Sequence, residues 1–197
     1  MVRVMDSYFD DFEKGAKLKW RPKTPSRWSI DLDRGDYSYH LHEKDFESGR
    51  DMTPGEYSIL EQVIDSANYE IEVTARSPEP LDSPWGHYGV IFGFLDTNNY
   101  HFFEFYRYVA GNALQKVEKG TRRYVRWLYD GLVTDDIYQT VKLRIRNDTV
   151  TVFVDGVEKA KIPEKIPFPA RVGLCTRNDE AYFDDFRITL LSRPAGD

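Results

Sequence analysis

One alternating segment, residues 100–108, carries the side chains best suited to binding chemistry. Its period of two sorts the side chains onto two faces, and only one of these faces can point into a core. One set is Tyr100, Phe102, Glu104 and Tyr106, and the other is His101, Phe103, Phe105 and Arg107. We expect the set that contains Glu104 to be exposed, so that a carboxylate stands beside aromatic rings on the surface.

Two other segments could extend this surface. Residues 122–129 present on one face either Arg123, Trp127 and Tyr129 or Arg122, Tyr124 and Arg126. In 140–146, Lys142, Arg144 and Arg146 alternate with apolar residues, so the basic set points out of the core. Aromatic rings stack on the apolar faces of sugars, and planar polar groups bind sugar hydroxyls. The pattern therefore predicts an oligo- or polysaccharide site formed by Glu104, Tyr106, Trp127 and Arg144, with an ordinary solvated sheet face as the alternative.

Other residue types with chemical potential have a simpler interpretation. His40 and His42 lie two residues apart and could begin a metal site, but no third ligand is evident, which favours surface histidines. Cys175, the single cysteine, ends the apolar run 172–175 and is expected in the core rather than as a catalytic thiol, because no base is evident. Phosphate-binding and dinucleotide-binding glycine motifs are absent.

The elements that position these residues are short strands. Helical spacing is almost absent, and alternating runs such as 69–75, 87–95 and 181–190 are separated by turn-forming clusters. Asp155-Gly156 predicts a two-residue hairpin turn, because both positions favour positive φ. A dozen or more closely spaced strands indicate an all-β sandwich of two antiparallel sheets, with under a tenth of the residues in helix. The simplest partition is one domain over 1–197, with its core within about 7–190 and a frayed tail at 192–197.

Length, charge and hydropathy narrow the classes of function. The chain has 197 residues, which suits one sizeable core. Its net charge of −6 disfavours a general nucleic-acid binder, which normally presents a basic face. No apolar run reaches the length of a transmembrane helix, so membrane insertion is not expected. Residues 1–12 carry acids where a signal peptide needs an apolar stretch. An intracellular protein and a secreted protein without its leader both fit, so the localisation stays open.

The order of several motifs resembles the concanavalin A-like lectin/glucanase superfamily. These motifs are Tyr8-Phe9-Asp10-Asp11-Phe12-Glu13-Lys14-Gly15, Trp20, Trp28-Ser29-Ile30, the run 89–96, Asn98-Asn99-Tyr100, the run 151–156, Val172-Gly173-Leu174 and the run 181–186. The resemblance covers about residues 7–190 and is greatest to laminin-G-like jelly rolls, to the 3-keto-disaccharide hydrolase-type domain of unknown function and to bacterial glycan-binding modules. It implies a jelly-roll sandwich in which the first and last strands, near 7–12 and 181–190, lie side by side.

This resemblance implies lectin-like carbohydrate binding without catalysis. Two alternatives remain, a glycoside hydrolase or related sugar-processing enzyme, and a laminin-G-like protein-interaction domain. Laminarinase-type relatives carry Glu-x-Asp-x-x-Glu on one strand, whereas Glu70-Ile71-Glu72 lacks a third acid at the needed spacing. The Gln-x-His of alginate-lyase-type relatives is also missing, because Gln62-Val63 is followed by Ile64.

The resemblance also implies a structural calcium ion as a cofactor. Many jelly-roll carbohydrate-binding modules hold calcium between an N-terminal Phe-Glu-x-Gly-like segment and a C-terminal Asp-Asp pair. In this chain Glu13 and Asp184 would be the side-chain ligands, and loop carbonyls would complete the six to eight oxygens that calcium takes. In the alternative interpretation, these acids are solvated or pair with Arg187 and Lys17.

Overall fold

The computed structural model describes residues 4–42, 54–78, 86–107, 111–133 and 136–192. These residues form strands and one short 3-10 turn, Pro25–Arg27, and no α-helix. The strands are β1 (Val4–Asp10), β2 (Trp20–Pro22), β3 (Trp28–Asp33), β4 (Asp36–Leu41), β5 (Glu56–Leu60), β6 (Tyr69–Arg76), β7 (His87–Asp96), β8 (Asn99–Tyr106), β9 (Ala113–Glu118), β10 (Thr121–Trp127), β11 (Gln139–Arg146), β12 (Thr149–Val154), β13 (Val157–Pro163), β14 (Arg171–Thr176) and β15 (Ala181–Leu191). The predicted all-β class is confirmed. Within the described part of the chain, no helix is long and apolar enough to cross a membrane.

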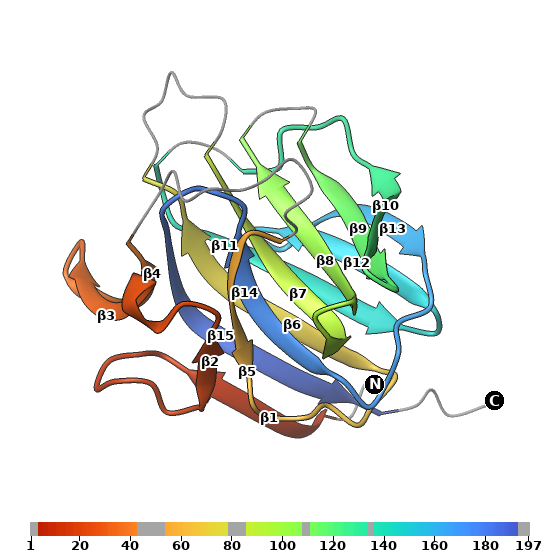
Figure 1. Cartoon of the computed structure of the whole chain (residues 1–197), viewed down its shortest axis with the longest axis horizontal. Helices are drawn as coiled ribbons and strands as arrows, with labels where there is room; N and C mark the ends of the chain where they lie inside the picture. The colour runs from red at the N-terminus through yellow and green to blue at the C-terminus, as the bar shows by residue number, and fades with distance from the viewer. Residues whose placement is uncertain (1–3, 43–53, 79–85, 108–110, 134–135, 193–197) are drawn as a thin grey trace.

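The strands form two antiparallel sheets that pack face to face (Figure 1). The eight-stranded sheet has the order β13-β12-β11-β6-β15-β4-β3, with β1 paired to β15. The seven-stranded sheet has the order β10-β9-β8-β7-β14-β5-β2. Neighbouring strands in each sheet are often distant in sequence, and the pairing of β1 with β15 brings the two ends of the described chain together. Ser7 pairs with Thr189 and Asp10 with Phe186, which confirms the predicted pairing of the first and last strands. The predicted frayed tail lies outside the described residues, apart from Ser192.

Alternation decides which side chains fill the space between the sheets. Ile71 and Val73 of β6 and Leu143 of β11 enter the core from the eight-stranded sheet, and Phe103 and Phe105 of β8 enter it from the seven-stranded sheet. The intervening residues of β6 and β11 therefore point outward. The turn between β12 and β13 is the predicted one, since Asp155 and Gly156 have φ of 49° and 76°.

The carboxylate of Asp10 anchors the segment that follows β1. Its Oδ1 accepts hydrogen bonds from the backbone N–H of Phe12, at 3.3 Å, and of Lys17, at 3.0 Å. Its Oδ2 accepts hydrogen bonds from the backbone N–H of Leu18 and from the indole N–H of Trp20, both at 3.0 Å. Asp10 is fully buried, so these donors take the place of water around its carboxylate. One side chain thus holds the loop between β1 and β2 in place.

Candidate functional site

The outer face of the seven-stranded sheet carries the residues predicted around Glu104. Phe103 and Phe105 belong to the main core, whereas Tyr100 and Phe102 belong to a separate apolar cluster on the opposite face of β8. Glu104 and Tyr106 share that opposite face by the period of two. The predicted facing of this strand is therefore correct, although all four side chains on this face are buried rather than exposed.

The strand register surrounds Glu104 with residues that have little or no side chain. Glu104 lies opposite Gly89 of β7 and Ala113 of β9, and Gly89 lies opposite Cys175 of β14. A Cβ at Gly89 would stand 2.8 Å from Cys175 Sγ and 3.0 Å from the Phe103 carbonyl oxygen, so only glycine fits there. Cys175 is fully buried, and burial raises the pKa of its thiol, as expected for a packing residue.

Glu104 is the centre of a buried polar cluster. Only 2% of its surface is exposed. Nη2 of Arg177 donates to both of its carboxylate oxygens, at 2.8 and 3.1 Å, and the amide of Gln115 donates to it as well. Gln115 Oε1 and Arg177 Nε are also buried, and neither has a hydrogen-bond partner among the described residues. The cluster therefore retains one acceptor and one donor for a further group.

His87 positions Arg177 from the neighbouring strand. The backbone N–H of Arg177 donates to His87 Nε2 at 2.9 Å, and His87 Nδ1 contacts the carboxylate of Asp179. Because Nε2 accepts a hydrogen bond, Nδ1 carries the proton and donates it to Asp179. The His87 ring also stacks on Tyr106, with centroids 4.4 Å apart and planes 2° apart. Tyr106 is therefore buried against the His87 ring and does not face solvent.

An aromatic pair lies beside this cluster on β10. Trp127 is half-buried on the outer face, opposite Ala113, and it stacks on Tyr124 with centroids 4.1 Å apart. Tyr124 is 39% exposed, and the guanidinium of Arg122 lies 5.2 Å from its ring centroid. A β-bulge between Tyr124 and Arg126 inserts one residue, which brings Tyr124 and Trp127 to the same face. Unbroken alternation along residues 122–129 would put these two residues on opposite faces, so the predicted facing of this strand is wrong.

Arg144 does not share this surface, so that part of the prediction is wrong. It lies on β11 in the eight-stranded sheet, where it points outward as predicted but on the other side of the sandwich. There its guanidinium pairs with Glu70 and lies 4.9 Å from the ring centroid of Phe153. Lys142 pairs with Glu72 at 3.1 Å beside it. The two acids considered for glycosidase chemistry are therefore engaged in ion pairs away from Glu104.

Of the two neighbouring histidines, His42 is exposed as expected, just after β4, whereas His40 on β4 is placed differently. His40 is buried rather than exposed. Its Nδ1 contacts Asp31 at 2.6 Å, its Nε2 contacts Glu180 at 2.8 Å, and its ring stacks on Tyr182. Within the described ranges, no three His, Cys, Asp or Glu side chains form a group that could hold a metal ion. Through its contacts with Asp31 and Glu180, His40 instead links β3, β4 and the residue before β15.

Glu13 and Asp184, the predicted calcium ligands, both lie among other carboxylates that influence their pKa values. The pKa of Asp184 is raised to about 7, first by burial and then by the negative charges of Asp185, Asp36 and Glu13. The pKa of Glu13 is raised mainly by its hydrogen bond with Asp36. Carboxylates that repel one another are the kind of oxygen donors a calcium ion prefers. The calcium site at Glu13 and Asp184 therefore stays a prediction.

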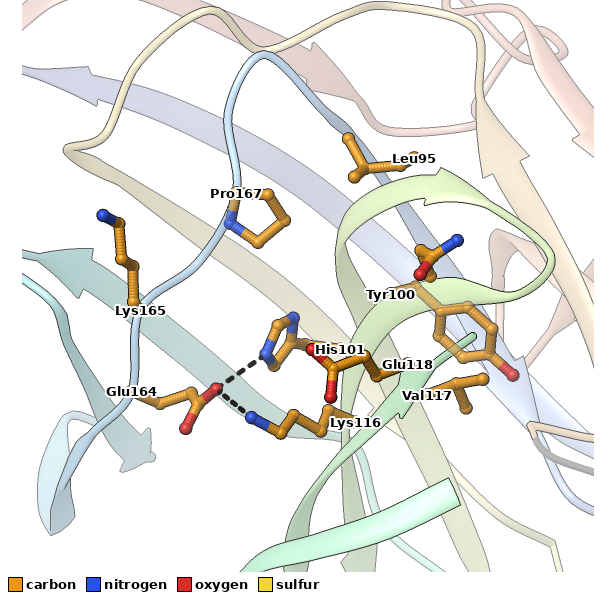
Figure 2. A pocket seen from close by; sticks show the side chains of 10 residues that line it. Leu95, Tyr100, His101, Lys116, Val117, Glu118, Glu164, Lys165 and Pro167 are labelled. Carbon is orange, nitrogen blue, oxygen red and sulfur yellow. Dashed lines mark hydrogen bonds and ion pairs between the residues drawn. The ribbon is translucent and has the colours of Figure 1, made fainter. Parts of the chain in front are cut away.

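A separate cavity of about 390 Å³ opens at the far end of β8 and β9 (Figure 2). Apolar and polar side chains share its wall. They are Leu95, Asn99, Tyr100, His101, Lys116, Val117, Glu118, Glu164, Lys165 and Pro167. Glu164 Oε1 lies 3.1 Å from His101 Nε2 and 3.1 Å from Lys116 Nζ, which joins the loop after β13 to β8 and β9. No motif in the sequence predicted this cavity, because its wall is assembled from segments that are distant in the chain.

Comparison with known proteins identifies the fold. No protein-family model and no curated protein matches the sequence. Among solved structures, the chain is similar to the carbohydrate-binding module CBM66 from Bacillus subtilis, with a TM-score of 0.64 and 10% identity over 87% of this chain and 96% of that chain. It is also similar to the Bacillus licheniformis β-glucanase, with a TM-score of 0.60 and 12% identity over 97% of this chain and 100% of that chain.

A third similar structure is the GH16 protein of a Bacteroides ovatus mixed-linkage glucan system, in complex with a G4G4G3G product. Its TM-score is 0.64 and its identity is 11%, over 92% of this chain and 99% of that chain. Identities this low carry information about fold and not about function. Together with the two-sheet topology, they show that this chain has an antiparallel jelly-roll sandwich fold.

Proposed function

We propose that this protein binds a carbohydrate, without cleaving it, on the outer face of the seven-stranded sheet. The observation that carries the proposal is the buried Glu104–Arg177 pair beside the stacked rings of Tyr124 and Trp127. Arg177 is 29% exposed at its side chain, so it is the member of the pair that a ligand can reach. The solved structures of similar fold include both a binding module and glucan-processing enzymes, which fits a sugar-related role.

The chemistry of this face suits binding more than hydrolysis. The Tyr124 and Trp127 rings offer apolar surface for a sugar ring, and Arg177 and Gln115 offer planar polar groups for hydroxyls. Glycoside hydrolysis normally uses two carboxylates, one of which must donate a proton. Glu104 is held by Arg177 and Gln115, and Asp179 is held by His87, so neither carboxylate is placed to take that role.

A glycan array on the purified chain, followed by calorimetry with the best ligand, tests the proposal. We expect selective retention of a glycan and no release of reducing sugar when the same glycan is incubated with the protein. Release of reducing sugar that Glu104→Gln abolishes would instead support the glycoside hydrolase. Failure to retain any glycan would contradict carbohydrate binding and favour the protein-interaction alternative.

Trp127→Ala should weaken glycan binding while leaving the fold intact. Because Trp127 is half-buried outside the main core, the free energy of unfolding should change by no more than about 1 kcal/mol. Loss of a stacking ring should reduce the binding free energy by roughly 1–3 kcal/mol, as measured by calorimetry. Arg144→Ala is the matched control, because it removes a large outward side chain from the other sheet, and it should leave the affinity unchanged. An equal loss in both variants would place the ligand elsewhere.

We also propose that Glu13 and Asp184 bind a calcium ion that stabilises the sandwich where β15 meets the N-terminal loop. Repulsion from neighbouring carboxylates adds to the burial that raises the pKa of Asp184 and to the hydrogen bond with Asp36 that raises the pKa of Glu13, and a cation would relieve this repulsion. Calcium that binds only the folded state should add roughly 2.7 kcal/mol of stability at a hundred times its dissociation constant. A chelator should therefore lower the melting temperature of the protein as isolated.

The pH dependence of stability should differ with and without calcium. The pKa of Asp184, about 7 in the folded protein, lies above the unfolded value of about 3.9, so the folded state holds the proton more tightly. Stability in chelator should consequently fall as the pH rises from about 4 to 7. Calcium or Asp184→Asn should flatten this fall, and Asp130→Asn, at an exposed site, should not. Identical melting curves in calcium and in chelator, on metal-free protein, would exclude the ion.

A further inference from the structure

The cavity at the end of β8 and β9 contains a buried histidine with one unused nitrogen. The side chain of His101 is only 9% exposed, and its Nε2 lies 3.1 Å from Glu164 Oε1. Its Nδ1 is buried and has no hydrogen-bond partner among the described residues. Figure 2 shows Nε2 directed at Glu164, while the other ring nitrogen faces away from it. Buried polar atoms are nearly always paired, so this nitrogen needs a partner from outside the described chain.

The protonation state of His101 follows from its surroundings. Burial lowers the pKa of His101, and this effect outweighs the opposite effect of Glu164, so the ring is neutral at pH 7. A neutral imidazole carries one N–H, and a carboxylate can only accept. The proton is therefore on Nε2, where it is donated to Glu164. Nδ1 is left as a bare acceptor, which calls for an O–H or N–H donor.

The charges around the cavity cancel. Lys116 Nζ lies 3.1 Å from the same oxygen of Glu164, so the ammonium and the carboxylate neutralise each other beside the uncharged ring. The remaining charged residues in the wall, Glu118 and Lys165, are exposed and have opposite signs. A charged ligand would find no uncompensated partner here. The polar part of the wall thus favours an uncharged ligand.

The rest of the wall is apolar and partly exposed. Leu95 is 49% exposed, and Val117, Pro167 and the ring of Tyr100 complete this side. A volume of about 390 Å³ lies in the range of small-molecule sites, about 300–1,000 Å³. A molecule that fits must present an apolar face to one side and hydroxyl groups to the other.

We propose that this cavity is a second ligand site, which binds one uncharged sugar unit through a hydroxyl donated to His101 Nδ1. The sugar ring rests against Leu95, Pro167 and Tyr100, and the Lys116–Glu164 pair meets its other hydroxyls. The site is independent of the one around Glu104. His101 and Glu104 are three residues apart on one strand, which puts them on opposite faces and roughly 10 Å apart along it.

Nitrogen-15 spectra of the labelled full chain test this proposal directly. Glucose, galactose, mannose and xylose are titrated separately, with glucuronate and inorganic phosphate as charged comparators. At least one neutral sugar should move the His101 Nδ1 resonance upfield, because this nitrogen then accepts a hydrogen bond from a sugar hydroxyl. The two charged probes should not move it. His101→Phe, which keeps a ring packed near Phe92, should lower the affinity for that sugar at least about fivefold. Trp127→Ala is the matched control and should leave this response unchanged.

The outcomes separate this site from the proposed function. If no neutral sugar moves the His101 signal, the nitrogen is paired with water and the second site is wrong, whatever the glycan array shows. Equal affinity in His101→Phe, or a stronger response to glucuronate or phosphate, would also overturn it. Conversely, a His101 response that persists without any Trp127-dependent binding would support this cavity and contradict the site around Glu104. The measurement on the unsubstituted protein stands even if His101→Phe does not fold.

Discussion

Replacing Asp10 with alanine should lower the free energy of unfolding by about 3–4 kcal/mol. The buried carboxylate accepts hydrogen bonds from three backbone N–H groups and from the indole of Trp20. Its loss leaves these donors without their common acceptor in a site that excludes water, and each unpaired buried donor is unfavourable. Chemical denaturation followed by tryptophan fluorescence measures the effect, and Trp20 reports on the same loop.

Asp11→Ala is the matched control for this prediction. Asp11 is the neighbouring residue, and its carboxylate pairs with Lys17 at a partly exposed position. Surface ion pairs of this type contribute little because water and salt screen them, so the stability of Asp11→Ala should stay near that of the unsubstituted protein. Equal effects of the two substitutions would show that Asp10 does not hold the loop. Asp10→Asn should fall between them, because an amide keeps one acceptor oxygen.

Arg177→Ala should destabilise the protein by about 3–5 kcal/mol, beyond any effect on binding. Glu104 is almost fully buried, and Arg177 is its cationic partner. Removing the guanidinium leaves a carboxylate charge in a site shielded from water, with Gln115 as its remaining donor among the described side chains. The unfolding free energy at pH 7 measures this loss.

A second substitution separates the charge from the lost side chain. In the Arg177→Ala background, Glu104→Gln removes the unpaired charge and should restore a large part of the stability. Arg144→Ala, which breaks a more exposed pair with Glu70, should reduce stability by no more than about 1 kcal/mol. If Arg177→Ala reduced the free energy of unfolding no more than Arg144→Ala, the Glu104–Arg177 pair would not behave as a buried ion pair. That result would contradict its assignment as the centre of the proposed site.

Features that depend on neighbouring residues were predictable from the sequence. The alternation of β8 placed Phe103 and Phe105 in the core and Glu104 on the opposite face, because a strand turns successive side chains to opposite sides. The Asp155-Gly156 turn was predictable for the same local reason, since its backbone conformation depends on those two residues. The order of motifs also predicted the jelly-roll fold and the pairing of β1 with β15.

Features that depend on pairing between distant strands were not predictable. Arg144 was correctly placed on an outward face, but a sandwich has two outward faces, and the pairing of β11 with β6 decides which one it joins. The bulge in β10 moved Tyr124 to the face of Trp127, and a bulge is defined only against the partner strand. Local alternation alone cannot reveal either result.

The sequence by itself determined the all-β class, the jelly-roll order and the facing of Glu104, because these follow from local periodicity, turn chemistry and motif order. The tertiary structure alone decided which side chains meet. Arg177 lies 73 positions from Glu104, and Glu164 lies 63 positions from His101, yet each pair is in hydrogen-bond contact. Such contacts arise where strands from distant parts of the chain become neighbours and loops close over them, and no pattern within either segment specifies its partner.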